Sequence, residues 1–73
     1  MMLNEKDAYL AMFSFLENLY KRTKSDDLGG LLGGMSLLED GSPADPAMWN
    51  DWLASLERLQ NGEVDASLRL DRL

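Results

Sequence analysis

The chain contains neither cysteine nor histidine. Without cysteine there are no disulfide bonds and no thiolate nucleophile, a composition that fits a reducing compartment. Without histidine the chain lacks the commonest general base and the commonest metal ligand. The serine and threonine hydroxyls have no evident base to activate them. These absences predict that the protein is not an enzyme.

Long hydrophobic runs are also missing. The longest stretch without a charged residue, residues 28–38, has 11 residues, and four of them are glycine. A membrane-spanning helix needs about 20 mostly apolar residues, and the first seven residues lack the basic and apolar regions of a signal peptide. At 45% hydrophobic residues, the 73-residue chain is too apolar for a disordered acidic tail. We therefore expect a small folded protein of the cytoplasm that does not interact with membranes.

Positive charge is absent from the middle of the chain. Residues 25–57 contain no lysine or arginine and carry a net charge of −7, whereas the whole chain carries −6. A basic cluster, defined as Lys21, Arg22 and Lys24, comes just before this acidic segment. The acidic residues of the segment are Asp26, Asp27, Glu39, Asp40, Asp45, Asp51 and Glu57. Because a field of one sign repels nucleic acid and attracts cations, we expect a cationic protein partner and no nucleic acid.

Apolar periodicity predicts three helices. Residues 5–23 follow a candidate N-cap, Asn4, and repeat apolar side chains every three or four residues. Residues 26–36 follow Ser25 in the same way. Residues 46–60 begin with a proline that follows an aspartate, which is a typical helix start. The pattern predicts an all-α fold, namely a small three-helix bundle.

This bundle is expected to form one helical domain over residues 1–62. Asp45 is expected to cap its third helix, and residues 39–43 have the composition of a turn. The short connections favour direct packing of neighbouring helices. The expected core consists of Tyr9, Met12, Phe13, Leu16, Leu19, Leu28, Leu31, Leu32, Trp52, Leu53 and Leu56.

Four glycines lie on the second helix, opposite its apolar side chains: Gly29, Gly30, Gly33 and Gly34. An interior glycine costs a helix about 1 kcal/mol relative to alanine, so the four together require about 4 kcal/mol from other interactions. Two explanations are open. Either another backbone, a neighbouring helix or an aromatic ring approaches the glycines closely, or the segment bends into a loop before Met35. We favour close packing of a continuous helix.

Trp49 and Trp52 share one face of the third helix, and a core this small does not easily bury both. Either both belong to the core, or one of them anchors a partner, since tryptophan is enriched in binding hot spots. The candidate protein-binding residues are Asp26, Asp27, Asp45, Trp49 and Asp51. The acids of the 39–45 turn do not have the spacing of a calcium loop, so we expect no bound metal and no cofactor.

Residues 63–73 form a C-terminal tail in which the periodicity changes to two. Val64, Ala66, Leu68 and Leu70 alternate with polar or charged residues, as in a strand, but no other segment has a strand pattern that could pair with it. Three states are open. The tail is disordered, or it lies across the bundle and buries Leu68 or Leu70, or it pairs as a strand with a second copy or a partner.

Two motifs carry a resemblance to known proteins. The stretch SDDLGGLLG over residues 25–33 and the stretch DPAMWNDWL over residues 45–53 together resemble a family of short, largely uncharacterised bacterial proteins. Some of its members are similar to small immunity proteins of contact-dependent and other polymorphic toxin systems. The resemblance covers residues 5–60 and implies a protein that masks a cationic toxin by occlusion. It implies no particular binding residue.

Two functions from different classes are therefore open. The first is an acidic binding module that is steered onto a cationic protein and anchored by a tryptophan. The second is a small self-associating structural or regulatory protein, a possible homodimer, whose second copy would cover the glycine face and the spare tryptophan. A DNA-mimic inhibitor ranks third, because the acids cluster in turns and do not trace a regular phosphate spacing.

Overall fold

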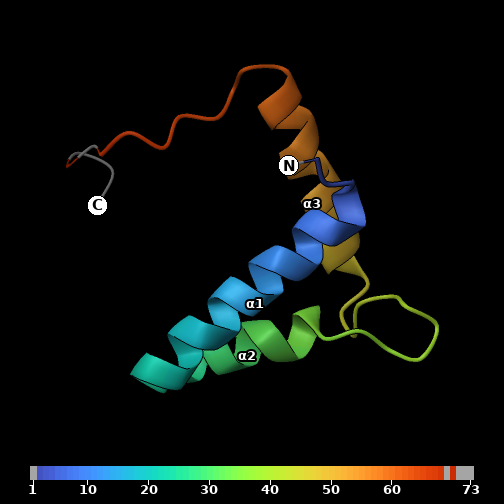
Figure 1. Ribbon diagram of the computed structural model, residues 1–73, viewed down its shortest axis with the longest axis vertical. Coiled ribbons are helices and arrows are strands. Elements are labelled where there is room, and N and C mark those ends of the chain that lie inside the picture. Colours follow the sequence, from blue (N-terminus) through green and yellow to red (C-terminus); the bar gives the residue numbers. More distant parts are fainter. Residues whose placement is uncertain (1, 69, 71–73) are drawn as a thin grey trace.

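The computed structural model describes residues 2–68 and residue 70, and this part of the chain is all-α (Figure 1). Helix α1 spans Glu5–Thr23, α2 spans Asp26–Met35 and α3 spans Ala47–Gln60. Each bound lies within one residue of its prediction, so the predicted fold class is confirmed. None of the helices within the described residues is both long enough and apolar enough to cross a bilayer.

Side-chain oxygens accept backbone N–H groups at the start of each helix. Asn4 Oδ1 and Ser25 Oγ accept hydrogen bonds, at 2.7 Å and 3.4 Å, from the backbone N–H groups three residues further on. Asp45 Oδ1 accepts the N–H of Ala47 at 3.0 Å. The N-cap of α3 is Pro46, which has no side-chain cap hydrogen bond, so the prediction of Asp45 as the N-cap is wrong by one residue. The Asp45 carboxylate still accepts the N–H of the first helical residue.

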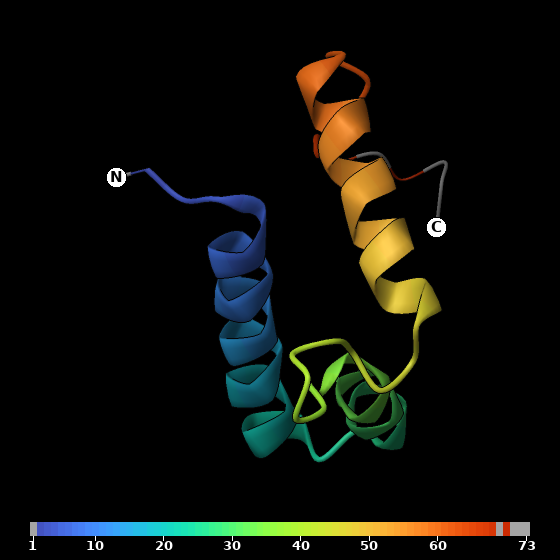
Figure 2. The same cartoon turned by 90° about the vertical axis from the view of Figure 1, so that its right-hand side faces the viewer.

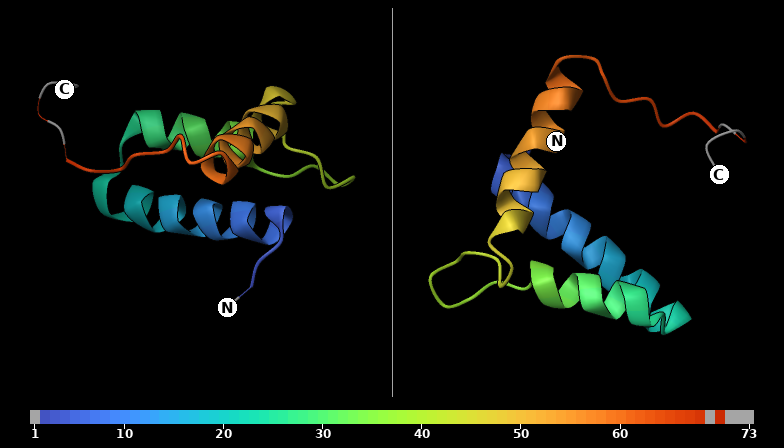
Figure 3. Two further views of the ribbon diagram at one scale, coloured as in Figure 1. Left: turned by 90° about the horizontal axis from the view of Figure 1, so that it is seen from above. Right: turned by 180° about the vertical axis from the view of Figure 1, so that it is seen from behind.

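Helices α2 and α3 both pack against α1, but on different halves of it (Figures 1 and 2). Helix α2 runs back along the C-terminal half of α1, and α3 crosses near the N-terminus of α1. Figure 3 shows α1 and α2 side by side, with α3 at one end of the pair. The second half of α3 extends past the first turn of α1 (Figure 1). The bundle is therefore open, and α1 is its central element.

This openness leaves much of the chain in contact with solvent. Its accessible surface is 5918 Å², whereas a compact monomer of 8.2 kDa exposes about 4,500 Å². The apolar residues that are buried among those described are Tyr9, Leu32, Met35 and Pro43. The expected core is wrong for Met12 and Leu53, each 40% exposed, because no further layer covers the space beside α3. Tyr9 and Leu32 of the expected core are buried, and its remaining members are half-buried.

Tyr9 connects the three helices. Its hydroxyl donates a hydrogen bond to the backbone carbonyl of Met35 at 2.9 Å, which ties α1 to the end of α2. Its ring meets Trp49 and Trp52 of α3 in edge-to-face contacts, with 5.7 Å between centroids in each pair. Contacts of this kind add about 0.5–1.5 kcal/mol to the burial of the rings. Tyr9 is therefore the centre of the small core.

Alkaline pH is expected to weaken this centre. Burial raises the pKa of Tyr9 above its ordinary value of 10.0, because the ionised phenolate is the form that burial disfavours. The stabilisation from a neutral Tyr9 is complete below about pH 10 and is lost as the pH rises toward the pKa of the folded protein. Urea unfolding of the wild type and Tyr9→Phe measures this loss. We expect the stability difference between them to shrink above pH 10, and a constant difference would contradict the assignment.

The connection between α2 and α3, residues 36–46, forms a hairpin loop. Leu37 and Pro43 form an isolated antiparallel bridge, and the N–H of Leu38 donates to the carbonyl of Ser42 at 2.8 Å. Gly41 has φ 88° and donates its N–H to the carbonyl of Leu38 at 2.9 Å. This is the pattern of a three-residue hairpin turn, which favours glycine at its left-handed position. The predicted turn at 39–43 is confirmed.

The glycines of α2 are not equivalent. Helix α2 continues without a bend to Met35, so the loop alternative is wrong. A Cβ on Gly29 would lie 3.1 Å from the Tyr20 ring, and one on Gly34 would lie 3.3 Å from the Met48 methyl group. The prediction of close packing is thus confirmed for these two glycines, although the groups that approach them are side chains and not a backbone. A Cβ on the other two, Gly30 and Gly33, would meet nothing within 4 Å.

This difference predicts opposite results from matched substitutions. Gly30→Ala and Gly33→Ala are each expected to raise the free energy of unfolding by about 1 kcal/mol, because both positions are helical and open. Gly29→Ala is expected to gain nothing or to destabilise, because the new methyl group must displace the Tyr20 ring. Urea unfolding followed by circular dichroism measures all three. Equal gains at positions 29 and 30 would show that the Tyr20 contact is unimportant.

The described part of the tail leads away from the helices (Figure 1). Residues 63–68 form neither helix nor strand, and every one of them is exposed. Leu68 is 83% exposed and Leu70 is 76% exposed, so packing of the tail across the bundle is wrong. Residues 69 and 71–73 lie outside the described residues. Disorder, and strand pairing with another chain, stay predictions.

Candidate functional site

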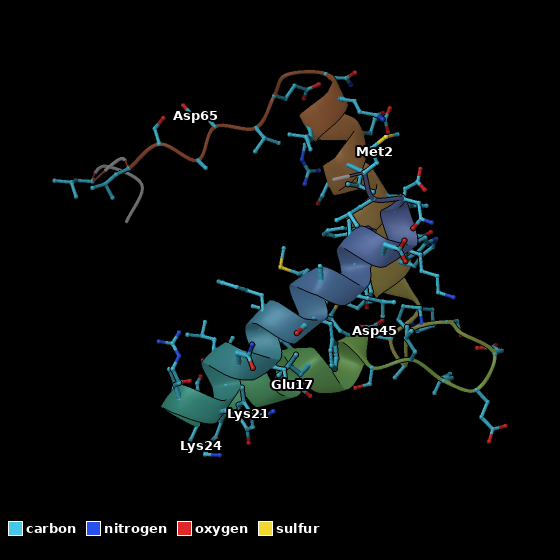
Figure 4. The ribbon with its side chains drawn as sticks, viewed as in Figure 1. Met2, Glu17, Lys21, Lys24, Asp45 and Asp65 are labelled. Atoms are coloured by element: carbon cyan, nitrogen blue, oxygen red, sulfur yellow. The ribbon has the colours of Figure 1, made fainter. Side chains whose placement is uncertain are left out.

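The structure does not bring the five predicted site residues together, and three of them lie at opposite ends of α2. Asp26 and Asp27 occupy its first turn, and Asp45 follows its other end. A helix of ten residues is about 15 Å long. Figure 4 shows Asp45 far from Lys21 and Lys24, which lie at the end of the molecule where α2 begins. The acidic segment is therefore not one continuous patch.

The end of the molecule that carries Asp26 and Asp27 is not acidic. The basic cluster ends α1 just before these aspartates, so the side-chain charges at this corner are −2 and +3. The backbone N–H of Lys24 donates a hydrogen bond to the carbonyl of Tyr20 at 2.7 Å, at the C-terminus of α1. The Lys24 ammonium lies 5.7 Å from the centre of the Tyr20 ring. The position of Asp26 and Asp27 is therefore better explained by their favourable interaction with the N-terminal dipole of α2 than by attraction of a cationic partner.

Negative charge gathers instead around the hairpin loop. Glu39, Asp40 and Asp45 are all exposed there. The Asp40 carboxylate accepts the Ser42 hydroxyl at 2.6 Å and the Ser42 backbone N–H at 2.9 Å. These two bonds, the hydroxyl first, hold the pKa of Asp40 below its ordinary value. The two hydrogen bonds thus favour the ionised form of Asp40.

Beside these acids lies a hollow of about 290 Å³, here called the Trp49 hollow. It is lined by Lys6, Tyr9, Leu37, Asp40, Gly41, Ser42, Pro43 and Trp49. Its walls come from the first turn of α1, from the hairpin loop and from the start of α3. Trp49 is half-buried, with one part against Tyr9 and the rest available to the hollow. The volume is at the lower end for small-molecule pockets and is enough for one long side chain.

Asp51 belongs to a different surface. It lines a second hollow of about 220 Å³ between the three helices, with Met12, Met48 and Trp52. Tyr9 lines both hollows and separates them. The structure thus keeps Trp49 near Asp40 and Asp45 but places Asp51 elsewhere.

Sequence reasoning missed part of the Trp49 hollow. Asp40 was visible in the acidic segment, but nothing in the pattern indicated that its loop would meet Trp49. Lys6 and Pro43 lie 37 residues apart in the chain, and only the fold brings them to one hollow. In the described part of the chain, no three acidic side chains come together in a way that could hold a metal ion.

Comparison of the chain with family profiles, with curated proteins and with solved structures gave no match. The resemblance to bacterial immunity proteins therefore stays an expectation that rests on the two motifs. Any function has to be argued from the surfaces described above.

Proposed function

We propose that the protein is an acidic binding module for a cationic protein and that it binds through the Trp49 hollow and the hairpin loop. The observation that carries this proposal is the half-buried Trp49, which lines a hollow together with Asp40. The connection that carries Asp40 also contains the exposed acids Glu39 and Asp45. Tryptophan is one of the residues enriched in the hot spots of protein interfaces. The surrounding acids supply complementarity to a basic partner.

The hollow suits an arginine or lysine side chain of the partner. Its apolar stem would lie along Leu37 and Pro43, and its cationic head would reach the Asp40 carboxylate and the face of Trp49. A cation over an indole ring gains about 0.5–2 kcal/mol, most when water is excluded. The chain's own Lys6 lines the same hollow and opposes such a cation. Lys6 is therefore expected to weaken binding.

The biological role that we propose is neutralisation of a cationic toxin in the cytoplasm. The protein would act without catalysis, by covering a basic surface that the toxin needs. The acidic character of residues 25–57 supports this role, as does the resemblance of the two motifs to a family of short bacterial proteins, some of which are similar to immunity proteins. A large secreted toxin encoded by a neighbouring gene would add support.

Affinity capture with four variants tests the proposal. The tagged protein is incubated with extract of the source cell at about 50 mM salt, where charge attraction is weakly screened. We expect the wild type to retain a basic protein and Glu39→Gln/Asp40→Asn/Asp45→Asn to lose it. The asparagine at position 45 still offers an oxygen to the N–H of Ala47. Trp49→Ala is expected to lose the partner as well.

Two further variants serve as controls of opposite kinds. Asp26→Asn/Asp27→Asn removes two negative charges at the far corner and is expected to keep the partner. Lys6→Gln removes the positive charge in the hollow, and this variant is expected to retain more of the partner than the wild type does. Recovery of the tagged protein alone, or equal recovery of a partner by all variants, would contradict the proposal.

A further inference from the structure

Among the described residues, only the start of α1 and the residues just before it face the second half of α3. This half of α3 extends past the N-terminus of α1 in Figures 1 and 2. Three leucines at three-residue steps, Leu53, Leu56 and Leu59, follow one another along it and are here called the leucine stripe. Leu53 is 40% exposed, Leu56 is half-buried and Leu59 is 60% exposed. The stripe lines one side of a groove of about 510 Å³, and Leu3 and Ala8 line the other side.

The leucine stripe is complementary to itself. When two copies of α3 pack antiparallel with Leu56 on the twofold axis, residues whose numbers add up to 112 face each other. Leu56 then meets Leu56 of the second copy, and Leu53 meets Leu59. Such a pairing is closed, because the same surface is used on both copies. It would bring the exposed leucines of both chains together.

The charges of α3 permit this pairing. Helix α3 carries Asp51, Glu57 and Arg58, a net charge of −1, although the chain as a whole carries −6. In the antiparallel register Glu57 faces Ser55, and Arg58 faces Ala54. No two like charges lie directly opposite each other among these residues. The acids of the hairpin loop lie outside the leucine stripe, whereas Glu5 and Glu57 line the groove beside it.

The exposed area is large enough for a dimer. The chain exposes 5918 Å², about 1,400 Å² more than expected for a compact monomer of its mass. The extended tail contributes to this excess. A stable interface buries about 800 Å² of each partner, and the exposed leucines and their groove supply apolar surface for such an interface.

We propose that the leucine stripe is the interface of a symmetric homodimer, in which α3 packs antiparallel against α3 of a second copy. The groove beside Leu3 receives the partner's leucines. The Trp49 hollow lies on another surface, so each copy can bind its cationic partner independently of the dimer. The dimer thus presents two such hollows.

Directed cross-linking tests the register, because the chain has no native cysteine. Chains carrying Leu53→Cys are mixed with chains of different mass carrying Leu59→Cys and are oxidised mildly. We expect the mixed disulfide to form at least about tenfold faster than the linked dimer of either variant alone. Phe15→Cys, at a position 65% exposed on α1, measures the rate of random collisions. If the mixed disulfide forms no faster than the disulfide between two Phe15→Cys chains, the antiparallel register is wrong.

Sedimentation equilibrium tests the dimer itself with the unmodified chain. We expect a dimer at high micromolar concentration and at least about tenfold weaker association for Leu59→Ser, since each dimer loses two buried leucines. Circular dichroism verifies that this variant is folded. A wild-type monomer would overturn the proposal. Association lost in the tail variant Val64→Lys/Leu68→Lys but kept in Leu59→Ser would also overturn it, in favour of strand pairing by the tail.

Discussion

Tyr9→Ala is expected to leave most of the chain unfolded. Replacing a buried aromatic residue by alanine costs about 3–5 kcal/mol, and Tyr9 is 2% exposed and contacts both other helices. At roughly 0.05–0.15 kcal/mol per residue, the whole domain has about 4–11 kcal/mol of stability. With so few buried side chains, we place this protein near the lower end. Far-ultraviolet circular dichroism at room temperature is expected to show most of the helical signal lost.

Tyr9→Phe separates the ring of Tyr9 from its hydroxyl. The variant keeps the ring contacts with the tryptophans but leaves the Met35 carbonyl without its donor. We expect it to fold and to lose about 1–2 kcal/mol, the usual range for a hydrogen bond whose buried partner is left unpaired. Full helicity in Tyr9→Ala would contradict the central position of Tyr9. A loss in Tyr9→Phe as large as in Tyr9→Ala would assign the whole effect to the hydroxyl.

Trp52→Ala is expected to have the second largest effect, a loss of about 3 kcal/mol. Trp52 packs on Tyr9, and its indole Nε1–H donates to the carbonyl of Glu5 at 2.9 Å. This bond fixes α3 to the first residue of α1. Since α3 has few other neighbours, we expect it to detach from α1 in the variant while α2 stays in place. Urea unfolding followed by circular dichroism measures the loss.

Conservative changes at the two tryptophans supply the matched comparison. Trp52→Phe keeps an aromatic ring but loses the bond to Glu5, and we expect a cost of about 1 kcal/mol beyond that of Trp49→Phe. Both variants retain one tryptophan, whose fluorescence follows unfolding. Equal stability of the two variants would show that the bond to Glu5 does not hold α3 in place.

The helices could be predicted because their signals are local. The side chains of Asn4, Ser25 and Asp45 accept N–H groups two or three residues ahead, at the start of each helix. The apolar periodicity of each helix is independent of the others. The positions of the helices relative to one another depend on distant contacts. The bond from Tyr9 to Met35 joins residues 26 apart, and that from Trp52 to Glu5 joins residues 47 apart.

The same distinction explains the errors in the predicted core. Met12 and Leu53 have the spacing of core residues, but spacing cannot reveal that α2 and α3 cover different halves of α1. The charge count likewise states the net charge of the acidic segment but not where its charges lie on the folded surface. The sequence placed Asp26 and Asp45 in one acidic segment, whereas the fold separates them by the length of α2 and puts a basic cluster beside the first.

The dependence of the association rate on salt tests the proposed function most directly. The captured basic partner is immobilised, and the rate constant is measured for the wild type and for Glu39→Gln/Asp40→Asn/Asp45→Asn between about 50 and 300 mM salt. For the wild type we predict a decrease of at least about tenfold across this range, with a much smaller decrease for the variant, because steering acts mainly on association. Equal salt dependence of the two proteins would contradict binding through the hairpin loop.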